Sequence, residues 1–448
     1  MSFSLLDIQD CFEGVIPSSV ATLDEVGEPN ISYLSQVWRV DETHVALSNQ
    51  FFSKTIANVR QTGHATALVV DGRNGDQYEL HLRWVEAQAA GEVFERMAAQ
   101  LRAISSQHGM QDVMSLRSAE IYRVLDVRQI PSLPAAAQIP VESAPKGERL
   151  ASAARLAAAI AAEDDAELML DRTLDGLVEL FGFSHVMVLV PGSEELRLTT
   201  LATRGYDQPG VGSEVAFGAG VIGIAAETRR PVRLCEMSRG RRFAAAVRSQ
   251  AGMAGDRSIP LPGLTAANSQ LAVPMVARGL MGGVLFAEDA RPFRFTREDE
   301  DALALIGAQL AAGLRLAEVQ AGTASEPPAI VAGSITAQPF RVRYYAFDDS
   351  LFINDEYLIK GVPGRLLLHV LQAYVAEGRA SFTNREIRLD ASLRLPDLKD
   401  NLEARLFLLR RRLDERGSPV RLIRLGRGRF GLEMTGKPIL EVVEDYRA

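Results

Sequence analysis

Two stretches of the sequence have no periodic apolar spacing, and they constrain the fold more than any other feature because they divide the chain. Residues 130–147 read IPSLPAAAQIPVESAPKG and residues 321–338 read AGTASEPPAIVAGSITAQ. A composition rich in Pro, Ala, Ser and Gly is typical of linkers. A length of 448 residues also suggests several domains. We predict three domains, at 1–132, 148–320 and 338–436, joined by linkers at 133–147 and 321–337.

The composition is that of a soluble globular protein, with 47% apolar and 24% charged residues. Cys11 and Cys235 are too few for a disulfide framework. The start MSFSLLDIQD has neither the basic region nor the apolar run of a signal peptide, and no apolar run approaches the ~18 residues that a membrane span needs. We therefore expect a cytoplasmic protein without a membrane partner.

The first domain is predicted to consist mainly of strands, with two short helices. The expected strands are 19–23, 30–40, 44–48, 65–71 and 80–87, and the expected helices are 5–12 and 53–60. Turn sequences such as DEVGEP and VDET separate neighbouring strands. This pattern predicts an antiparallel barrel.

This order of elements resembles the split barrels of the pyridoxamine-phosphate-oxidase-like family, which bind FMN, deazaflavin or occasionally haem. The sharpest part of the resemblance is LSNQFFSKTIAN at 47–58. In that family an equivalent strand end and helix start hold the flavin phosphate with hydroxyls, a cation and helix N-terminal amides. The resemblance implies FMN or a related flavin, held by Ser48, Asn49, Ser53, Lys54 and Thr55.

Two features of this stretch favour a structural role instead. Ser53 is also a typical N-cap, and Lys54 a typical solvated charge. The family usually adds an Arg and a Lys on one strand, whereas ISYLSQVWRV offers only Arg39. Both interpretations of the stretch therefore stay open.

The second domain alternates helices and strands. We expect helices at 148–161, 166–181 and 297–319, and strands at 185–190, 196–202, 231–234, 271–275 and 282–286. The arrangement resembles GAF domains over about 170 residues, through G-x-G-x-x-G-x-A at Gly218–Ala225 and LAVPMVARGLMGGVLF. GAF domains serve as ligand-binding or dimerisation modules, so the resemblance implies a small-molecule ligand whose identity the sequence does not give.

The glycines of this stretch also match the dinucleotide pattern GxGxxG, but no βαβ unit with a later acidic residue follows. A helix start packed tightly on a sheet explains Gly218, Gly220 and Gly223 better. Cys235 follows a strand and is either an oxidant sensor or simply packed.

The last helix of the second domain has an apolar stripe at spacings of three and four residues: Leu303, Ile306, Leu310, Leu314 and Ala317. Such a stripe either pairs with a second copy of the helix or packs on the domain's own sheet. The first alternative predicts a homodimer.

The third domain carries the most basic segment. Leu398, Leu402, Leu406, Leu409 and Leu413 mark one face of a helix over 398–415. Gly417-Ser418-Pro419 ends it, and strands at 420–425 and 430–434 flank the turn Gly426-Arg427-Gly428. A helix followed by an Arg-tipped hairpin predicts a winged helix.

The charge distribution also favours a winged helix that contacts DNA. Residues 381–430 contain 13 Lys and Arg against 7 Asp and Glu, a charge of +6 in a chain of net charge −8. Concentrated positive charge is typical of a DNA-contacting face. A solvated helix with excess Arg is the alternative.

From residue 340 to residue 434 the order of elements resembles the effector domain of response regulators of the OmpR/PhoB type, with helices at 362–377, 383–389 and 398–415. The resemblance implies DNA binding through the last helix and the hairpin. The expected contact residues are Lys399, Arg405, Arg410, Arg412, Arg424, Arg427 and Arg429. Phe407 and Leu408 stand where the family usually carries basic or polar residues, which favours contact with thymine methyls or with protein.

The predicted fold class is multidomain α+β: a split β-barrel, a GAF α/β sandwich and a winged helix. The predicted function is a ligand- or redox-sensing transcriptional regulator. The alternatives are a flavin-dependent oxidoreductase regulated by the GAF domain, and a signalling protein whose winged helix binds protein. The sequence contains no nucleophile–base constellation and no metal motif, so we assign no catalytic residue.

Overall fold

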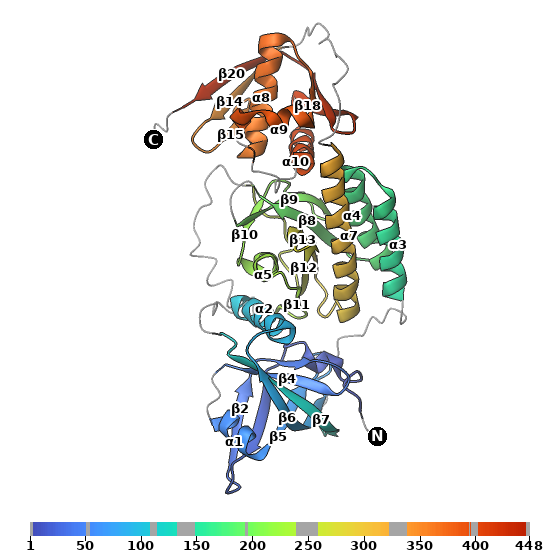
Figure 1. Ribbon diagram of the computed structural model, residues 1–448, viewed down its shortest axis with the longest axis vertical. Coiled ribbons are helices and arrows are strands. Elements are labelled where there is room, and N and C mark those ends of the chain that lie inside the picture. The colour runs from blue at the N-terminus through green and yellow to red at the C-terminus, as the bar shows by residue number, and fades with distance from the viewer. Residues whose placement is uncertain are drawn as a thin grey trace.

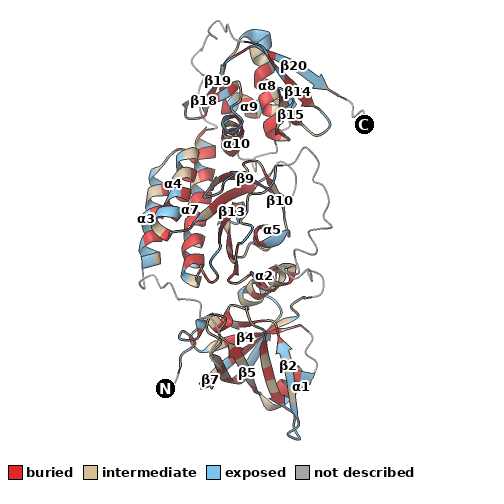
Figure 2. Cartoon of the chain, turned by 180° about the vertical axis from the view of Figure 1, so that it is seen from behind, coloured by how far each residue is buried: buried red, intermediate tan, exposed pale blue. Residues whose placement is uncertain are grey.

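The computed structural model describes residues 3–50, 54–107, 114–131, 148–192, 196–238, 259–321, 338–393, 395 and 402–444. Three domains are stacked along the long axis of the molecule (Figure 1), with the N-terminal domain at one end and the C-terminal domain at the other. The buried residues concentrate inside each of them and where they meet (Figure 2).

The N-terminal domain is a curled seven-stranded antiparallel sheet in the order β2-β1-β5-β6-β7-β4-β3, a half-barrel that is called the barrel below. Its elements are η1 (Gln9–Phe12), β1 (Ser18–Leu23), β2 (Pro29–Leu34), β3 (Val37–Arg39), β4 (His44–Asn49), α1 (Lys54–Thr62), β5 (His64–Val70), β6 (Gln77–Gln88), α2 (Glu92–Gln107) and β7 (Ser118–Ile130). The strand predicted over 30–40 is in fact two strands: β2 pairs with β1, whereas β3 pairs with β4.

Helix α2 and strand β7 are absent from the sequence prediction. The register between β6 and β7 shifts by one residue: His81 faces Asp126, but the next residue, Leu82, faces Val124. The extra residue forms a bulge that interrupts the period-two alternation by which a strand is recognised.

The middle domain is a six-stranded antiparallel sheet in the order β10-β9-β8-β13-β12-β11. The strands are β8 (His185–Pro191), β9 (Arg197–Arg204), β10 (Glu214–Ala216), β11 (Val232–Leu234), β12 (Ser269–Ala277) and β13 (Leu280–Asp289), and the helices are α3 (Glu148–Ala162), α4 (Ala166–Phe181), α5 (Gly220–Thr228) and α7 (Arg297–Ala321). Helices α3, α4 and α7 cover one face, and α5 lies on the other with α2 of the N-terminal domain (Figure 1).

Helix α4 begins and ends at its predicted residues because both ends are capped. The Asp165 carboxylate accepts hydrogen bonds from the backbone N–H groups of Glu167 and Leu168, and Gly182 closes the helix in the left-handed conformation. The predicted turn at Arg278-Gly279 joins β12 to β13, with both residues at positive φ.

The glycine stretch opens α5 as predicted, tight against the neighbouring strand. A Cβ on Gly223 would lie 2.2 Å from the carbonyl oxygen of Ala216, and Gly218 has φ +77°. Close packing therefore accounts for these glycines.

The described residues of the C-terminal domain form two small sheets and three α-helices. Its elements are β14 (Phe340–Tyr345), β15 (Ser350–Ile353), β16 (Glu356–Ile359), α8 (Val362–Glu377), β17 (Ser381–Thr383), α9 (Asn384–Leu389), η2 (Ala391–Leu393), α10 (Leu402–Glu415), β18 (Val420–Gly426), β19 (Arg429–Met434) and β20 (Pro438–Val443). The first four residues of the helix predicted over 398–415 lie outside the described part of the chain. Strand β20, beyond the expected boundary at 436, pairs in parallel with β14 and completes the order β16-β15-β14-β20.

The hydrophobic cores of the middle and C-terminal domains join into one cluster, whereas the barrel has its own core. Helix α7 belongs to the joint cluster. Among the described residues it has the length and apolar composition to cross a membrane, but half of that stretch is buried inside the protein. Its stripe, from Leu303 to Ala317, is buried in this cluster, so α7 is a core helix of the middle domain.

Candidate functional site

The residues predicted to hold a flavin phosphate surround the end of β4 and the start of α1, and Ser53 lies outside the described residues. Ser48 is buried, and its hydroxyl accepts a hydrogen bond from the backbone N–H of Gln36 at 3.2 Å. The Asn49 side-chain amide donates to the hydroxyl of Ser118 at 2.9 Å. Both polar groups are thus bonded within the barrel.

Thr55 is also buried and bonded internally. Its hydroxyl accepts from the Asn30 side-chain amide at 2.9 Å and is hydrogen-bonded to the Ser32 hydroxyl at 2.9 Å. Lys54 is exposed and presents a cation at the first position of α1. For a flavin phosphate this arrangement offers Lys54 and the first-turn backbone amides of α1 rather than the three side chains.

Six of the seven residues predicted to contact DNA lie in the described part of the chain, and Lys399 lies outside it. Arg405 and Arg412 on α10 are buried, with exposed fractions of 4% and 5%. The Arg412 guanidinium donates to the backbone carbonyl of Leu358 at 2.9 Å and pairs with Glu415 at 3.1 Å. Burial lowers the pKa of Arg412, an effect that Glu415 partly offsets. In this arrangement Arg405 and Arg412 do not present their guanidinium groups to solvent.

Arg410 and Arg424 lie closer to the surface but pair with acids of the middle domain. The Arg410 guanidinium pairs with the Glu167 carboxylate and donates to the carbonyl of Leu422 at 3.1 Å. Arg424 pairs with the Asp165 carboxylate that caps α4.

Arg411, which the sequence analysis left out of the site, makes a similar pair. It donates to both carboxylate oxygens of Asp171 at 2.7 and 3.0 Å and lies over the ring of Phe407 at 5.1 Å. The basic side of α10 therefore lies against an acidic side of α4.

Arg427 and Arg429 occupy the tip and the second strand of the β18–β19 hairpin. Arg427 is exposed and Arg429 is half-buried. Gly426 and Gly428, with φ of +132° and +63°, allow the tight turn between the strands. Arg427 at the hairpin tip is therefore a solvent-exposed part of the predicted surface.

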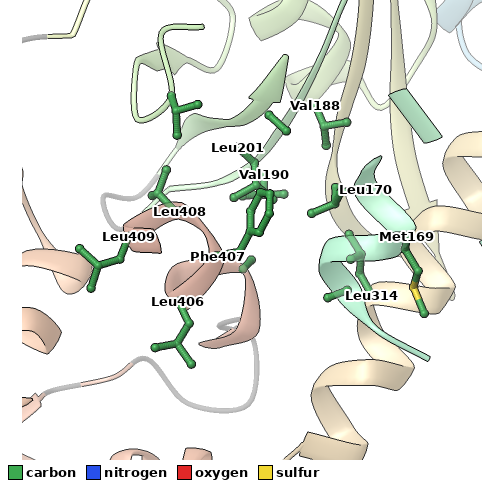
Figure 3. Close-up of a cluster of buried hydrophobic side chains, with 14 of the residues drawn as sticks. Met169, Leu170, Val188, Val190, Leu201, Leu314, Leu406, Phe407, Leu408 and Leu409 are labelled. Carbon is green, nitrogen blue, oxygen red and sulfur yellow. The ribbon is translucent and has the colours of Figure 1, made fainter. Parts of the chain in front are cut away.

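The side of α10 that faces the middle domain is apolar as well as basic. Phe407 and Leu408 are 3% and 2% exposed. Figure 3 shows Phe407 pointing from α10 toward Val190 and Leu201 of the middle-domain sheet. These two residues join the cores of the two domains.

Sequence reasoning missed the acidic side of α4. Glu167, Asp171 and Asp175 recur every four residues, a spacing visible in the sequence that places them along one side of the helix. Their partners were not predictable, because Arg410 and Arg411 follow them by about 240 residues. Asp171 and Asp175 also pair with Arg204 of β9 at 2.7 and 2.8 Å.

Helix α7 reaches the same interface with its C-terminal end. The Glu318 carboxylate accepts a hydrogen bond from the backbone N–H of Glu403 in the first turn of α10 at 2.9 Å. It also pairs with Arg388 of α9. A carboxylate at this position neutralises the positive end of the α10 dipole.

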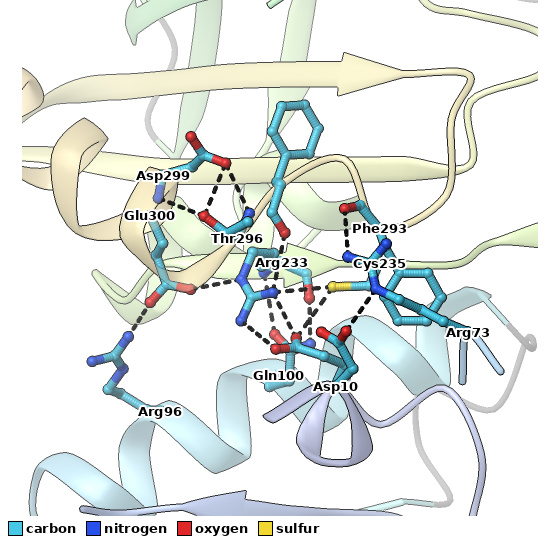
Figure 4. A network of polar contacts seen from close by, with 12 residues as sticks. Asp10, Arg73, Arg96, Gln100, Arg233, Cys235, Phe293, Thr296, Asp299 and Glu300 are labelled. Atoms are coloured by element: carbon cyan, nitrogen blue, oxygen red, sulfur yellow. Dashed lines mark hydrogen bonds and ion pairs between the residues drawn. The ribbon is translucent and has the colours of Figure 1, made fainter. Parts of the chain in front are cut away.

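The opposite end of α7 lies at the interface with the barrel, where a buried arginine organises a polar network (Figure 4). Arg233 of β11 pairs with Glu13 of the barrel at 2.6 Å and with Glu300 of α7 at 3.2 Å. Glu300 in turn pairs with Arg96 of α2. Burial alone would lower the pKa of Arg233, but Glu13, Cys235 and Glu300 outweigh it and raise the pKa.

Cys235 is packed inside this network. The Arg233 guanidinium donates to its sulfur at 3.1 Å, and the thiol donates to Glu13 at 3.2 Å. Burial and the Glu13 carboxylate raise the pKa of Cys235, which disfavours the reactive thiolate. This geometry favours the packing role over the oxidant sensor.

On the α5 side of the middle-domain sheet one acid is buried. Glu288 is 2% exposed and accepts hydrogen bonds from the Leu264 backbone N–H at 2.8 Å and from the Gln270 side-chain amide at 3.1 Å. Burial raises the pKa of Glu288, and the two donors partly offset the rise.

No group of three or more potential metal ligands is present among the described residues.

The family model of the GAF domain matches residues 165–314. A comparison with curated proteins gives no match.

Solved structures resemble separate parts of the chain. The GAF domain of an Acinetobacter phosphoenolpyruvate-protein phosphotransferase is 21% identical, covering 41% of this chain and 99% of its own at a TM-score of 0.32. Free methionine-R-sulfoxide reductase from Neisseria meningitidis is 19% identical, with coverages of 40% and 95% and a TM-score of 0.31. An FMN-binding protein from Syntrophomonas wolfei is 16% identical, with coverages of 28% and 87% and a TM-score of 0.24.

The family match lies inside the range predicted for the second domain, and the six-stranded sheet with its helices occupies the same residues. Residues 165–314 are therefore a GAF domain, which supports a role of this chain in signalling or sensing.

Proposed function

We propose that the chain is a cytoplasmic transcriptional regulator in which the barrel and the GAF domain sense a small molecule and the C-terminal domain is a winged helix that binds DNA. The observation that carries the proposal is the order α8-β17-α9-α10-β18-β19, whose three strands pair as β17-β19-β18. Three helices followed by an antiparallel hairpin are the elements that a winged helix uses to place a helix in the major groove.

The charges of this domain support the same proposal. Arg427 is exposed at the hairpin tip, and Arg421 is exposed near the start of β18, at the other end of the hairpin. Arginines on a hairpin next to a groove-binding helix can contact phosphates on both sides of the groove.

The proposal is tested by the salt dependence of binding. We expect the full chain to bind duplex DNA with an affinity that falls as salt rises. The double substitution R427A/R429A is expected to reduce the log–log slope by about 0.9 for each phosphate that the variant no longer neutralises. Fluorescence anisotropy between ~50 and ~200 mM salt measures both slopes. Salt-independent or undetectable binding, by the full chain and by a folded 338–444 fragment, would contradict DNA binding.

A protein-binding role is the second candidate, because Phe407 and Leu408 already contact protein. Both side chains are buried against the GAF domain, and aromatic and aliphatic side chains at such positions are typical of protein interfaces. The fragment experiment separates the two candidates, since a protein module binds no duplex at any salt concentration.

For the barrel we propose binding of FMN or a related flavin at the start of α1. Lys54 and the first-turn amides are the groups that support it, since Ser48 and Thr55 are bonded internally. We expect Lys54→Ala to weaken flavin binding about ten- to a hundredfold, the strength of a charged hydrogen bond. Calorimetric titration with FMN and with a deazaflavin measures the effect, and Arg60→Ala at the other end of α1 is the matched control. Equal affinities in wild type and Lys54→Ala would place any flavin elsewhere.

A further inference from the structure

The side of α10 that the proposed function would turn toward DNA is the side that the GAF domain covers. Leu406 and Leu409 pack inside the C-terminal domain, whereas Phe407 points at the GAF sheet (Figure 3). Helix α10 contacts α4, α7 and β9 of the GAF domain. A duplex and the GAF domain cannot occupy this side of the helix together.

The charged contacts of this interface match those that a DNA backbone would make. Three arginines of the C-terminal domain each meet one carboxylate at the α4 end of the GAF domain: Arg410 meets Glu167, Arg411 meets Asp171 and Arg424 meets Asp165. The Nη2 group of Arg411 donates to both carboxylate oxygens of Asp171, a charged hydrogen bond of the kind that guanidinium groups also make to phosphate oxygens.

The start of α10 has an acidic partner too. Glu318 of α7 accepts the backbone N–H of Glu403, in the first turn of a fourteen-residue helix. Helix N-termini of this kind also hold phosphate oxygens of DNA. Four carboxylates thus take positions at which the proposed DNA-binding surface would meet negative charge.

We propose that the acidic side of α4, together with Glu318, is an intramolecular substitute for the DNA backbone that keeps the C-terminal domain closed against the GAF domain. The inference rests on the proposed DNA binding and adds its regulation. DNA competes with the GAF domain for the same arginines, so the apparent affinity for DNA is the intrinsic affinity multiplied by the fraction of open molecules. A signal that weakens the interface increases DNA binding without altering any residue that contacts DNA.

The test uses the full chain with the isosteric double substitution E167Q/D171N. It removes two carboxylates and leaves every arginine of the proposed DNA-binding surface in place. The two ion pairs that it removes between the domains are partly exposed, so we expect apparent DNA affinity to rise about three- to tenfold. Small-angle X-ray scattering of the same samples is expected to show a larger radius of gyration.

Asp175→Asn is the matched control. Asp175 lies on the same side of α4 and pairs with Arg204, which belongs to the GAF domain itself. The Asp175→Asn substitution is expected to leave both the DNA affinity and the radius of gyration at wild-type values. Glu167→Gln alone, expected to give a smaller rise, provides a second variant if the double one is unstable.

The outcomes separate the inference from the function on which it rests. Wild type and E167Q/D171N binding DNA with equal affinity would overturn the inference and leave DNA binding intact. Absence of DNA binding by both, with the double variant expanded in scattering, would overturn the proposed function. The inference is supported if E167Q/D171N binds DNA more tightly and has a larger radius of gyration than wild type, while Asp175→Asn changes neither quantity.

Discussion

At the scale of single residues, backbone conformation and close packing explain the glycines at 218 and 223. Gly218 needs its positive φ, and its backbone N–H donates to the carbonyl of Gly223 at 2.8 Å. Gly223 needs its missing side chain, because Ala216 lies against it. The sequence allowed this packing role to be predicted, since the pattern lacked the acidic residue of a dinucleotide site.

Gly223→Ala is therefore expected to lower the free energy of unfolding by about 1–3 kcal/mol through overpacking. Urea unfolding of the full chain, followed by circular dichroism, measures the change. Gly279→Ser is an informative comparison, because a side chain there meets open space and is disfavoured only by φ +73°. A Gly223→Ala protein as stable as wild type would show that the backbone of α5 relaxes.

Glu288 gives the GAF domain a pH-dependent stability. Burial raises its pKa above the ordinary 4.5, so the folded state holds the proton more tightly than the unfolded state. The stabilisation is complete below the ordinary pKa and is lost as pH rises through the folded pKa.

Glu288→Gln keeps an acceptor for Leu264 but does not ionise, so the variant is expected to lose less stability than wild type as pH rises from about 4.5 to 7. Urea midpoints at several pH values measure the difference. Parallel pH profiles for the two proteins would show that Glu288 is not the responsible group.

At the scale of elements, helix boundaries followed the sequence where caps are local. Helix α8 spans its predicted residues, with Gly361 before it and Gly378 in the left-handed conformation after it. Helix α9 begins with a capping box of Thr383 and Glu386. Strands were predicted less completely, because pairing with distant partners decides them: β7 pairs with both β6 and β4.

The stripe on α7 faces its own sheet, so the homodimer predicted from the sequence needs another surface. Leu310 is fully buried in the joint core. Leu305, Leu316 and Val319, on the outer side of α7, are 54%, 57% and 60% exposed. A second copy could cover this outer side without disturbing the core.

We therefore expect Leu310→Glu to destabilise the fold by several kcal/mol, since it buries an unpaired charge. Leu316→Glu is expected to keep the fold and yield monomer, if the chain dimerises through α7. Light scattering at micromolar concentration, combined with thermal unfolding, distinguishes these effects. A dimeric Leu316→Glu protein would exclude this side of α7 as the seam.

At the scale of the whole molecule, the GAF domain could be predicted from the sequence, but the contacts between the domains could not. The GAF domain was predicted, and a family match confirms it over residues 165–314. The predicted contact residues Arg410 and Arg424 lie at an interface because acids far away in the chain pair with them. Such pairings leave no periodic signal, since each partner alone is an ordinary surface charge.

Helix α7 connects the two interfaces of the GAF domain. Glu300, near its start, meets Arg233 and Arg96 at the barrel, and Glu318, near its end, meets α9 and α10. The helix has 25 residues and a length of about 37 Å. We therefore expect a shift of this helix at one interface to alter the contacts at the other.

The ion pairs between α10 and α4 also give the molecule two opposing responses to ionic strength. Arg410 and Arg411 are 19% and 33% exposed, so dissolved salt screens their pairs with Glu167 and Asp171 and favours separation of the domains. The same salt weakens the attraction of the freed arginines for phosphate. The affinity of the full chain for DNA would accordingly fall less steeply with rising salt than the affinity of a permanently open protein.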